Sequence, residues 1–349
     1  MKINDLELFL IEVARSDGLP PVESLLVCLT TDSGQQGWGE TQLSWRGDEL
    51  LARRQLLLTE LAGHSVFNVE ELCRLDVLDV PALACAVETA CWDLIGKIGN
   101  QPVCHFWGGC FRSRVPLVVR IPKTAPDEAG RLARELNEHG FHLLIVTLDG
   151  RPQDDLALVE TIRESVEDRA QLLLDGGGRY APVAARGFCQ DLEPLQTAGL
   201  MDPLPAGRWA EMASLAQQTD VPLVAADAVC GPRDVMAIAR ASAAAGVVVD
   251  PLRVGGLLAT QRCAAVAQAA GLHVALGGRP RLGVGTAAML QLAAAVPSFT
   301  SGTQCDYHQL QDDVLADALE VIDGMMTVAP APGLGVEVDR AKIERYQLS

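Results

Sequence analysis

Three aspartates close successive short apolar runs in the middle of the chain: Asp175, Asp202 and Asp227. Each run has the length and composition of a buried strand. If the strands are neighbours in a parallel sheet, the three carboxylates lie side by side. A hard cation such as Mg²⁺ prefers such oxygen ligands. An aspartate at a strand end can also simply cap the next helix, which explains each one taken alone.

Other polar residues stand at the ends of similar runs. Arg120 and Lys123 lie at the end of the first run, where either residue can anchor a carboxylate and Lys123 can serve as a base. A surface lysine and a structural arginine are the simpler interpretation. Asp250 closes the sixth run. His308 follows the eighth and is expected to reach the same region, although a lone histidine is more often structural.

The elements that must position these residues form a regular series. Apolar runs alternate with amphipathic segments, and the first residues of successive runs lie 23 to 29 positions apart. This rhythm predicts βα units in a parallel (β/α) barrel, with an open doubly wound sheet as the alternative. No Gly-x-Gly-x-x-Gly follows the first strand, which favours the barrel. The runs are Pro116–Ile121, His142–Leu148, Gln171–Asp175, Gly199–Asp202, Pro222–Asp227, Gly246–Asp250 and Leu272–Gly277, with a weaker one at Ser298–Cys305.

The remaining segments predict two flanking parts. Residues 1–112 combine strands with a long helical stretch and form an N-terminal α+β capping domain. The barrel occupies residues 113–305. Residues 306–349 carry their own turns and are expected to pack back on the N-terminal domain.

Composition narrows the function classes. The chain has 349 residues and a formal net charge of −17. Such a charge repels phosphate backbones, so we expect no nucleic-acid partner. We expect no membrane partner either, because no apolar run has the length of a span. Ten cysteines without a Cys-x-x-Cys pair, and no export signal, predict reduced thiols in a cytoplasmic protein.

Several motifs, spread over most of the chain, give the sequence a family resemblance. It resembles the mandelate racemase and muconate lactonizing enzyme branch of the enolase superfamily, whose members have an enolase-type barrel with an N-terminal capping domain. The motifs are Asp32-Ser33-Gly34-Gln35-Gln36-Gly37-Trp38-Gly39-Glu40, Ala90-Cys91-Trp92-Asp93-Leu94, Gly99-Asn100-Gln101-Pro102, Gly108-Gly109, Gly140-Phe141, Arg253-Val254-Gly255-Gly256-Leu257 and Pro332-Gly333-Leu334-Gly335.

The resemblance implies a reaction and a cofactor. Members of this branch abstract a proton next to a carboxylate, and a divalent metal, usually Mg²⁺, stabilises the enolate. It also implies metal ligands: Asp175 matches the first and Asp227 the third. Asp306 is the equivalent of a glutamate that strand eight often supplies. Homo-oligomers are common in the family, so a homo-oligomer is expected.

The match fails at most catalytic positions. The lysines expected on strand two fall on Ile145 and Thr147, neither of which is a useful base. The asparagine often found after the first ligand is Gly177. The second ligand falls on Met201, a poor partner for Mg²⁺. The adjacent Asp202 points to the opposite face unless the strand end is twisted.

The sixth and seventh strands are also incomplete. Asp250 matches the aspartate of a His/Asp dyad, and it would need a raised pKa to act as a base alone. The histidine of that dyad is missing near Gly277. His273 lies at the other end of the strand.

Three hypotheses follow. The first is a protein that kept the fold and lost or altered the chemistry, with Arg120 and Thr147 contacting a small carboxylate ligand. The second is a metal-dependent isomerase or lyase, with Asp175, Asp227 and either Asp202 or Asp306 on Mg²⁺ and Asp250, Lys123 or His308 as the base. The third is a barrel enzyme of another class, such as a hydrolase with paired carboxylates.

Overall fold

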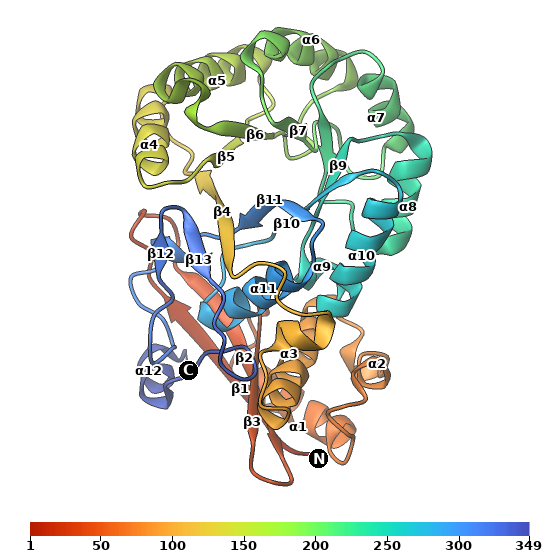
Figure 1. Ribbon diagram of the computed structural model, residues 1–349, viewed down its shortest axis with the longest axis vertical. Coiled ribbons are helices and arrows are strands. Elements are labelled where there is room, and N and C mark those ends of the chain that lie inside the picture. Colours follow the sequence, from red (N-terminus) through yellow and green to blue (C-terminus); the bar gives the residue numbers. More distant parts are fainter. Residues whose placement is uncertain (349) are drawn as a thin grey trace.

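The computed structural model describes residues 1–348, which form a barrel stacked on a smaller N-terminal part (Figure 1). The N-terminal part has a three-stranded antiparallel sheet in the order β1-β2-β3. Three helices accompany the sheet. The bounds are β1 (Ile3–Val13), β2 (Val22–Thr31), β3 (Gln36–Thr41), α1 (Gly47–Leu61), α2 (Val69–Leu72) and α3 (Pro81–Ile98).

Eight parallel strands then form a closed barrel. The last strand pairs with the first through Gln304 and Val118, which confirms the predicted barrel and excludes the open sheet. Every predicted run overlaps one of these strands, and only β4 begins before its run, at Arg114. The bounds are β4 (Arg114–Ile121), β5 (Leu143–Thr147), β6 (Gln171–Asp175), β7 (Gly199–Met201), β8 (Leu223–Ala225), β9 (Gly246–Val249), β10 (His273–Leu276) and β11 (Phe299–Gln304).

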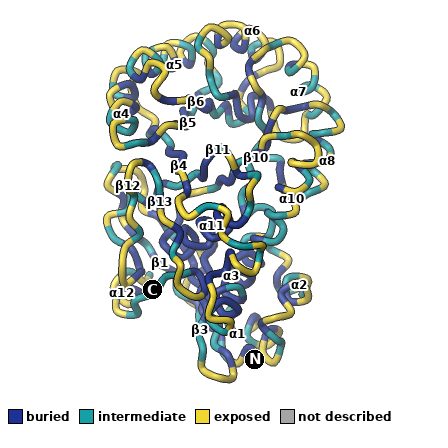
Figure 2. Tube along the Cα trace, viewed as in Figure 1, coloured by how far each residue is buried: buried dark blue, intermediate teal, exposed yellow. Residues whose placement is uncertain are grey.

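Helices surround the barrel because each has an apolar stripe that must be buried. Their inner faces contribute Ala129, Val159, Phe188 and Ile238 to the main core, and their outer faces are exposed (Figure 2). Pro stands in the first turn of five of them, where its missing N–H costs no hydrogen bond. The bounds are α4 (Pro126–Glu138), α5 (Pro152–Val166), α6 (Pro182–Leu192), α7 (Trp209–Ala216), α8 (Pro232–Ala241), α9 (Pro251–Val254), α10 (Leu257–Ala269) and α11 (Gly283–Ala295).

Helix α11 is buried along its whole length, between the barrel and the N-terminal part. Its first turn is held by Glu40 of β3, whose carboxylate accepts hydrogen bonds from the N–H groups of Leu282 and Gly285. Asp313 accepts another from Gly283. The conspicuous Glu40 of the Gly-Trp-Gly-Glu motif therefore caps a helix and joins the two parts of the chain.

Asp93 explains why three distant motifs occur together. Its carboxylate accepts hydrogen bonds from the N–H groups of Trp38 at 3.0 Å and Leu334 at 2.9 Å, and it pairs with Lys97 at 2.7 Å. Gly39 allows α3 to approach β3, because a Cβ there would overlap the carbonyl of Ala86. The motifs that carry the resemblance are thus structural.

The segment after β11 returns to the N-terminal sheet. The N–H of Leu348 donates to the carbonyl of Leu10, and Arg340 pairs with Glu7. A short hairpin of this segment also extends the sheet beside β4. The bounds are β12 (Val321–Ile322), β13 (Met325–Thr327) and α12 (Arg340–Tyr346). Across residues 1–348, no helix combines the length and apolarity needed to cross a bilayer.

Candidate functional site

The strand ends of the barrel carry one compact polar cluster. Arg120 of β4 directs Nη1 to Thr147 Oγ1 at 2.6 Å and to Asp175 Oδ2 at 2.7 Å. Thr147 and Asp175 are the last residues of β5 and β6, and Arg120 is the last but one of β4. They lie two positions beyond Val118, Ile145 and Leu173, which pack inside the barrel, so alternation turns all three side chains inward. The structure thus brings together both predicted ligand-contacting residues and the first predicted metal ligand.

The next two inward positions hold no carboxylate. Met201 of β7 packs in the apolar layer inside the barrel, together with Val224 and Ala226 from the β8 segment. Asp227 lies in the turn that follows β8. Its Oδ1 pairs with Arg253 at 2.9 Å, and its side chain is 58% exposed. The role of Asp227 as a metal ligand stays a prediction, and in this structure its carboxylate is engaged by Arg253.

Asp202 serves the backbone. Its Oδ1 and Oδ2 accept hydrogen bonds from the N–H groups of Ala226 at 2.9 Å and Asp227 at 2.8 Å. The residue has a φ of 43°, so the strand end is twisted, as the prediction required. Both oxygens are engaged by the neighbouring strand, however. Burial raises the pKa of Asp202 to about 6.

Asp250 lies beside a buried arginine that the sequence analysis did not identify. Arg281 pairs with Asp250 Oδ1, and the arginine side chain is only 5% exposed. The same oxygen accepts the N–H of Leu252 at 3.1 Å, so Asp250 also caps α9. Both contacts are made by Oδ1, so this oxygen of Asp250 is engaged by the protein. The run Gly277-Gly278-Arg279-Pro280-Arg281 after β10 was the available signal, because charged loops at this end of a barrel line the site.

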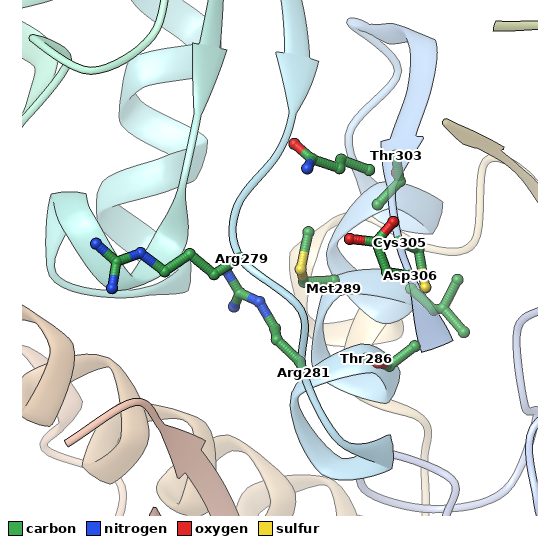
Figure 3. Close-up of a pocket in the computed structure, with 9 residues that line it drawn as sticks. Arg279, Arg281, Thr286, Met289, Thr303, Cys305 and Asp306 are labelled. Carbon is green, nitrogen blue, oxygen red and sulfur yellow. The ribbon is translucent and has the colours of Figure 1, made fainter. Parts of the chain in front are cut away.

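A small pocket separates Arg281 from Asp306, the predicted equivalent on strand eight. Figure 3 shows Arg281 and Asp306 on different sides of this pocket, with Thr286 and Met289 of α11 between them. Arg281 Nε is buried without a hydrogen-bond partner in residues 1–348. Burial raises the pKa of Asp306, although the charges of Arg15 and Arg120 oppose the shift.

The two other predicted bases lie apart from the cluster. Lys123 Nζ pairs with Asp149 Oδ1 at 2.5 Å, and its side chain is 66% exposed. The His308 ring packs on Phe141, with ring centroids 5.0 Å apart. Phe141 lies between α4 and β5, away from the strand ends, and burial lowers the pKa of His308 to about 4. A role for His308 at the barrel mouth stays a prediction, and these contacts give it no support.

These residues do not fit a divalent cation. Asp175, Asp227, Asp250 and Asp149 each pair with an arginine or lysine of this chain, and Asp202 is held by backbone amides. In the part of the chain that the structure describes, no three His, Cys, Asp or Glu side chains gather in a metal-binding group. A Mg²⁺ ion in this place would have to displace the Arg120 guanidinium from Asp175 and would find Met201 and Ala226 beside it.

The family follows from the fold and from sequence comparison. The family model described as "Enolase C-terminal domain-like" matches residues 128–342. The chain therefore belongs to this family, in the mandelate racemase and muconate lactonizing enzyme branch of the enolase superfamily. The resemblance drawn from the motifs is confirmed.

Relatives cover almost the whole chain at low identity. Muconate cycloisomerase 1 of Rhodococcus opacus is 27% identical over 339 residues, which are 92% of this chain and 90% of the relative. N-succinyl-L-Arg/Lys racemase of Bacillus cereus is 23% identical over 92% of this chain and 89% of the relative. The crystal structure of a muconate cycloisomerase from Azorhizobium caulinodans superposes with a TM-score of 0.87 at 27% identity, covering 99% of this chain and 98% of that one.

Proposed function

We propose that this protein binds a small carboxylate at the barrel mouth through Arg120 and does not carry out metal-assisted proton abstraction. The observation that carries the proposal is the position of the Arg120 guanidinium, between Asp175 and Thr147 at the inward strand ends. The guanidinium of Arg120 is permanently charged. It therefore offers an anionic ligand a positive charge at the place where members of the family use Mg²⁺.

Arg120 has donors left for a ligand. Only Nη1 donates to the protein among residues 1–348, so Nε and Nη2 form an unoccupied edge, and 28% of the side chain is exposed. That edge presents two parallel N–H groups, which match the two oxygens of a carboxylate. No residue at the mouth is supported as the base that would remove a proton from the ligand. Ile145 and Thr147 stand where the family has lysines, and Asp250 is paired with Arg281.

Thermal unfolding of the full chain tests both halves of the proposal. A ligand that binds only the folded state must raise the melting temperature. We expect succinate or N-acetylglycine to raise it in the native chain but not in Arg120→Gln, and Mg²⁺ or Mn²⁺ to change nothing relative to EDTA. Arg131→Gln on the exposed face of α4 is the matched control. A rise with Mg²⁺ that Asp175→Asn abolishes would contradict the proposal.

A divalent-metal-dependent isomerase or lyase is the second candidate, because the relatives are named as racemases and cycloisomerases. Proton exchange in D₂O distinguishes it without knowledge of the product. Under this candidate, at least one amino acid, sugar acid or dipeptide exchanges its α-proton with solvent, and Asp250→Asn stops the exchange. Under the binding proposal, no compound exchanges above the rate without protein.

Cytoplasmic location and homo-oligomer formation accompany the proposal as expectations. The ten cysteines are all unpaired, which agrees with a reducing compartment.

A further inference from the structure

The end of the barrel opposite to Arg120 contains a large cavity. Its volume is about 790 Å³, within the range of small-molecule sites. Residues at the starts of the strands form its opening, among them His142, Gln171, Gly246 and His273. Val118, Leu173, Val224, Val248 and Ala275 line it more deeply.

Two of the positions that line the cavity, Ala275 and Gly302, carry little or no side chain. Barrel interiors are ordinarily filled by layers of branched side chains. Here Val248 and Ala275 lie next to each other on β9 and β10, and Gly302 of β11 also lines the cavity. The layer of Val118, Leu173 and Met201 closes the cavity toward the mouth. The cavity and the Arg120 cluster are therefore separate sites on the two sides of one apolar layer.

The rim of the cavity is polar and carries a cation without an ion-pair partner. Arg169 forms no salt bridge within residues 1–348, and its Nε makes only a 3.4 Å contact to the carbonyl of Val166. The adjacent Asp168 also lines the rim. Burial lowers the pKa of Arg163, and the charge of Asp168 opposes that shift. His142 and His273 also stand on the rim, with the hydroxyl-bearing Thr300 and Ser301.

We propose that this cavity binds a hydrophobic monoanion, such as a medium-chain or aromatic carboxylate. The apolar body lies against Val224, Val248 and Ala275, and the anionic group contacts Arg169 at the rim. Burying an apolar body is favourable by about 25 cal/mol for each Å² removed from water. In a chain of net charge −17, an unpaired arginine on an apolar cavity selects for an anion. This site does not depend on the function proposed for the mouth.

Fluorescence titration with 1-anilinonaphthalene-8-sulfonate tests the proposal on the full chain. The probe has an apolar ring system and one negative charge. We expect saturable binding of one probe per chain, displaced by octanoate but not by succinate. Ala275→Phe fills the cavity and should weaken binding at least tenfold. Arg169→Gln should weaken it several-fold for octanoate and leave octanol binding unchanged, and the exposed Arg134→Gln on α4 serves as its control.

Circular dichroism must show that each variant is folded, because the probe also binds loosened cores. If Ala275→Phe does not fold, photolabelling of the native chain with 4-benzoylbenzoate replaces it. Labelled peptides should then contain residues 245–248 or 273–275 and disappear with excess octanoate. The absence of saturable binding, unchanged affinity in a folded Ala275→Phe variant, or labels confined to other segments would each overturn the proposal.

Discussion

Arg120 Nη1 lies 2.7 Å from Asp175 Oδ2. Asp175 stands at the first metal-ligand position of the family, and its negative charge is here paired with an arginine of β4, which is separated from β6 by β5. Both side chains are mostly buried, at 28% and 17% exposure. A charge in that setting is costly without a partner, so the two residues depend on each other. Ion pairs also engage Asp250, with the buried Arg281, and Asp227, with Arg253 in a more exposed place.

This dependence predicts strong coupling between Arg120 and Asp175. Arg120→Gln and Asp175→Asn each leave a partly buried charge unpaired, and each should lower the free energy of unfolding by about 1–3 kcal/mol. The double variant should lose less than the sum of the two, because it removes both charges. The coupling energy in a double-mutant cycle, measured by urea unfolding, should lie between about 0.5 and 3 kcal/mol. Strict additivity would show that the pair contributes nothing in solution.

Arg281 should have a larger effect on stability than any exposed arginine. Its side chain is 5% exposed and its partner Asp250 16% exposed, so Arg281→Gln leaves a carboxylate largely buried and unpaired. We expect a loss of about 3–5 kcal/mol in the free energy of unfolding. Adding Asp250→Asn to that variant should restore part of the loss. Arg233→Gln, on the first turn of α8, is the control and should change stability by less than about 0.5 kcal/mol.

Asp93 provides a test of the structural role of the motifs. Asn at this position cannot accept from Trp38, Lys97 and Leu334 together, since one of its two polar atoms is a donor. Asp93→Asn should cost on the order of 3 kcal/mol in urea unfolding. Asp127→Asn, exposed on α4, should be neutral. Equal stability of the two variants would mean that Asp93 does not hold the motifs together.

The sequence was sufficient for the fold, because the barrel is encoded locally. Each strand is a short apolar run, and the family motifs are contacts such as Asp93 with Trp38 that allow few substitutions. At the site, the sequence pointed to Arg120, Thr147 and Asp175 because they stand at or next to the ends of strands.

Two features of the site could not be read from the sequence, for physical reasons. The first is the packing of Val224 and Ala226 inside the barrel, which the run that ends at Asp227 does not reveal. Charge partners are the second feature. Arg281 is 31 residues from Asp250, and Arg253 is 26 residues from Asp227, so nothing in the local pattern reveals either pair.

Glu88 predicts the pH dependence of stability. It lies in α3, where burial raises its pKa from an ordinary 4.5 to about 7, although its Oε1 accepts hydrogen bonds from Leu258 N and Trp92 Nε1. Between pH 4.5 and 7 the folded chain therefore holds a proton that the unfolded chain has released. Stability contributed by Glu88 must fall as pH rises through this window, by about 1.4 kcal/mol for each pH unit at most.

Glu88→Gln keeps the neutral form at every pH and can still accept both hydrogen bonds. We expect the free energy of unfolding of this variant to fall less steeply than that of the native chain between pH 4.5 and 7, so that the variant gains relative stability toward pH 7. Glu60→Gln, exposed on α1, should follow the native curve. Parallel native and Glu88→Gln curves in urea unfolding would show that Glu88 titrates alike in both states, and its burial against α10 would then not raise its pKa.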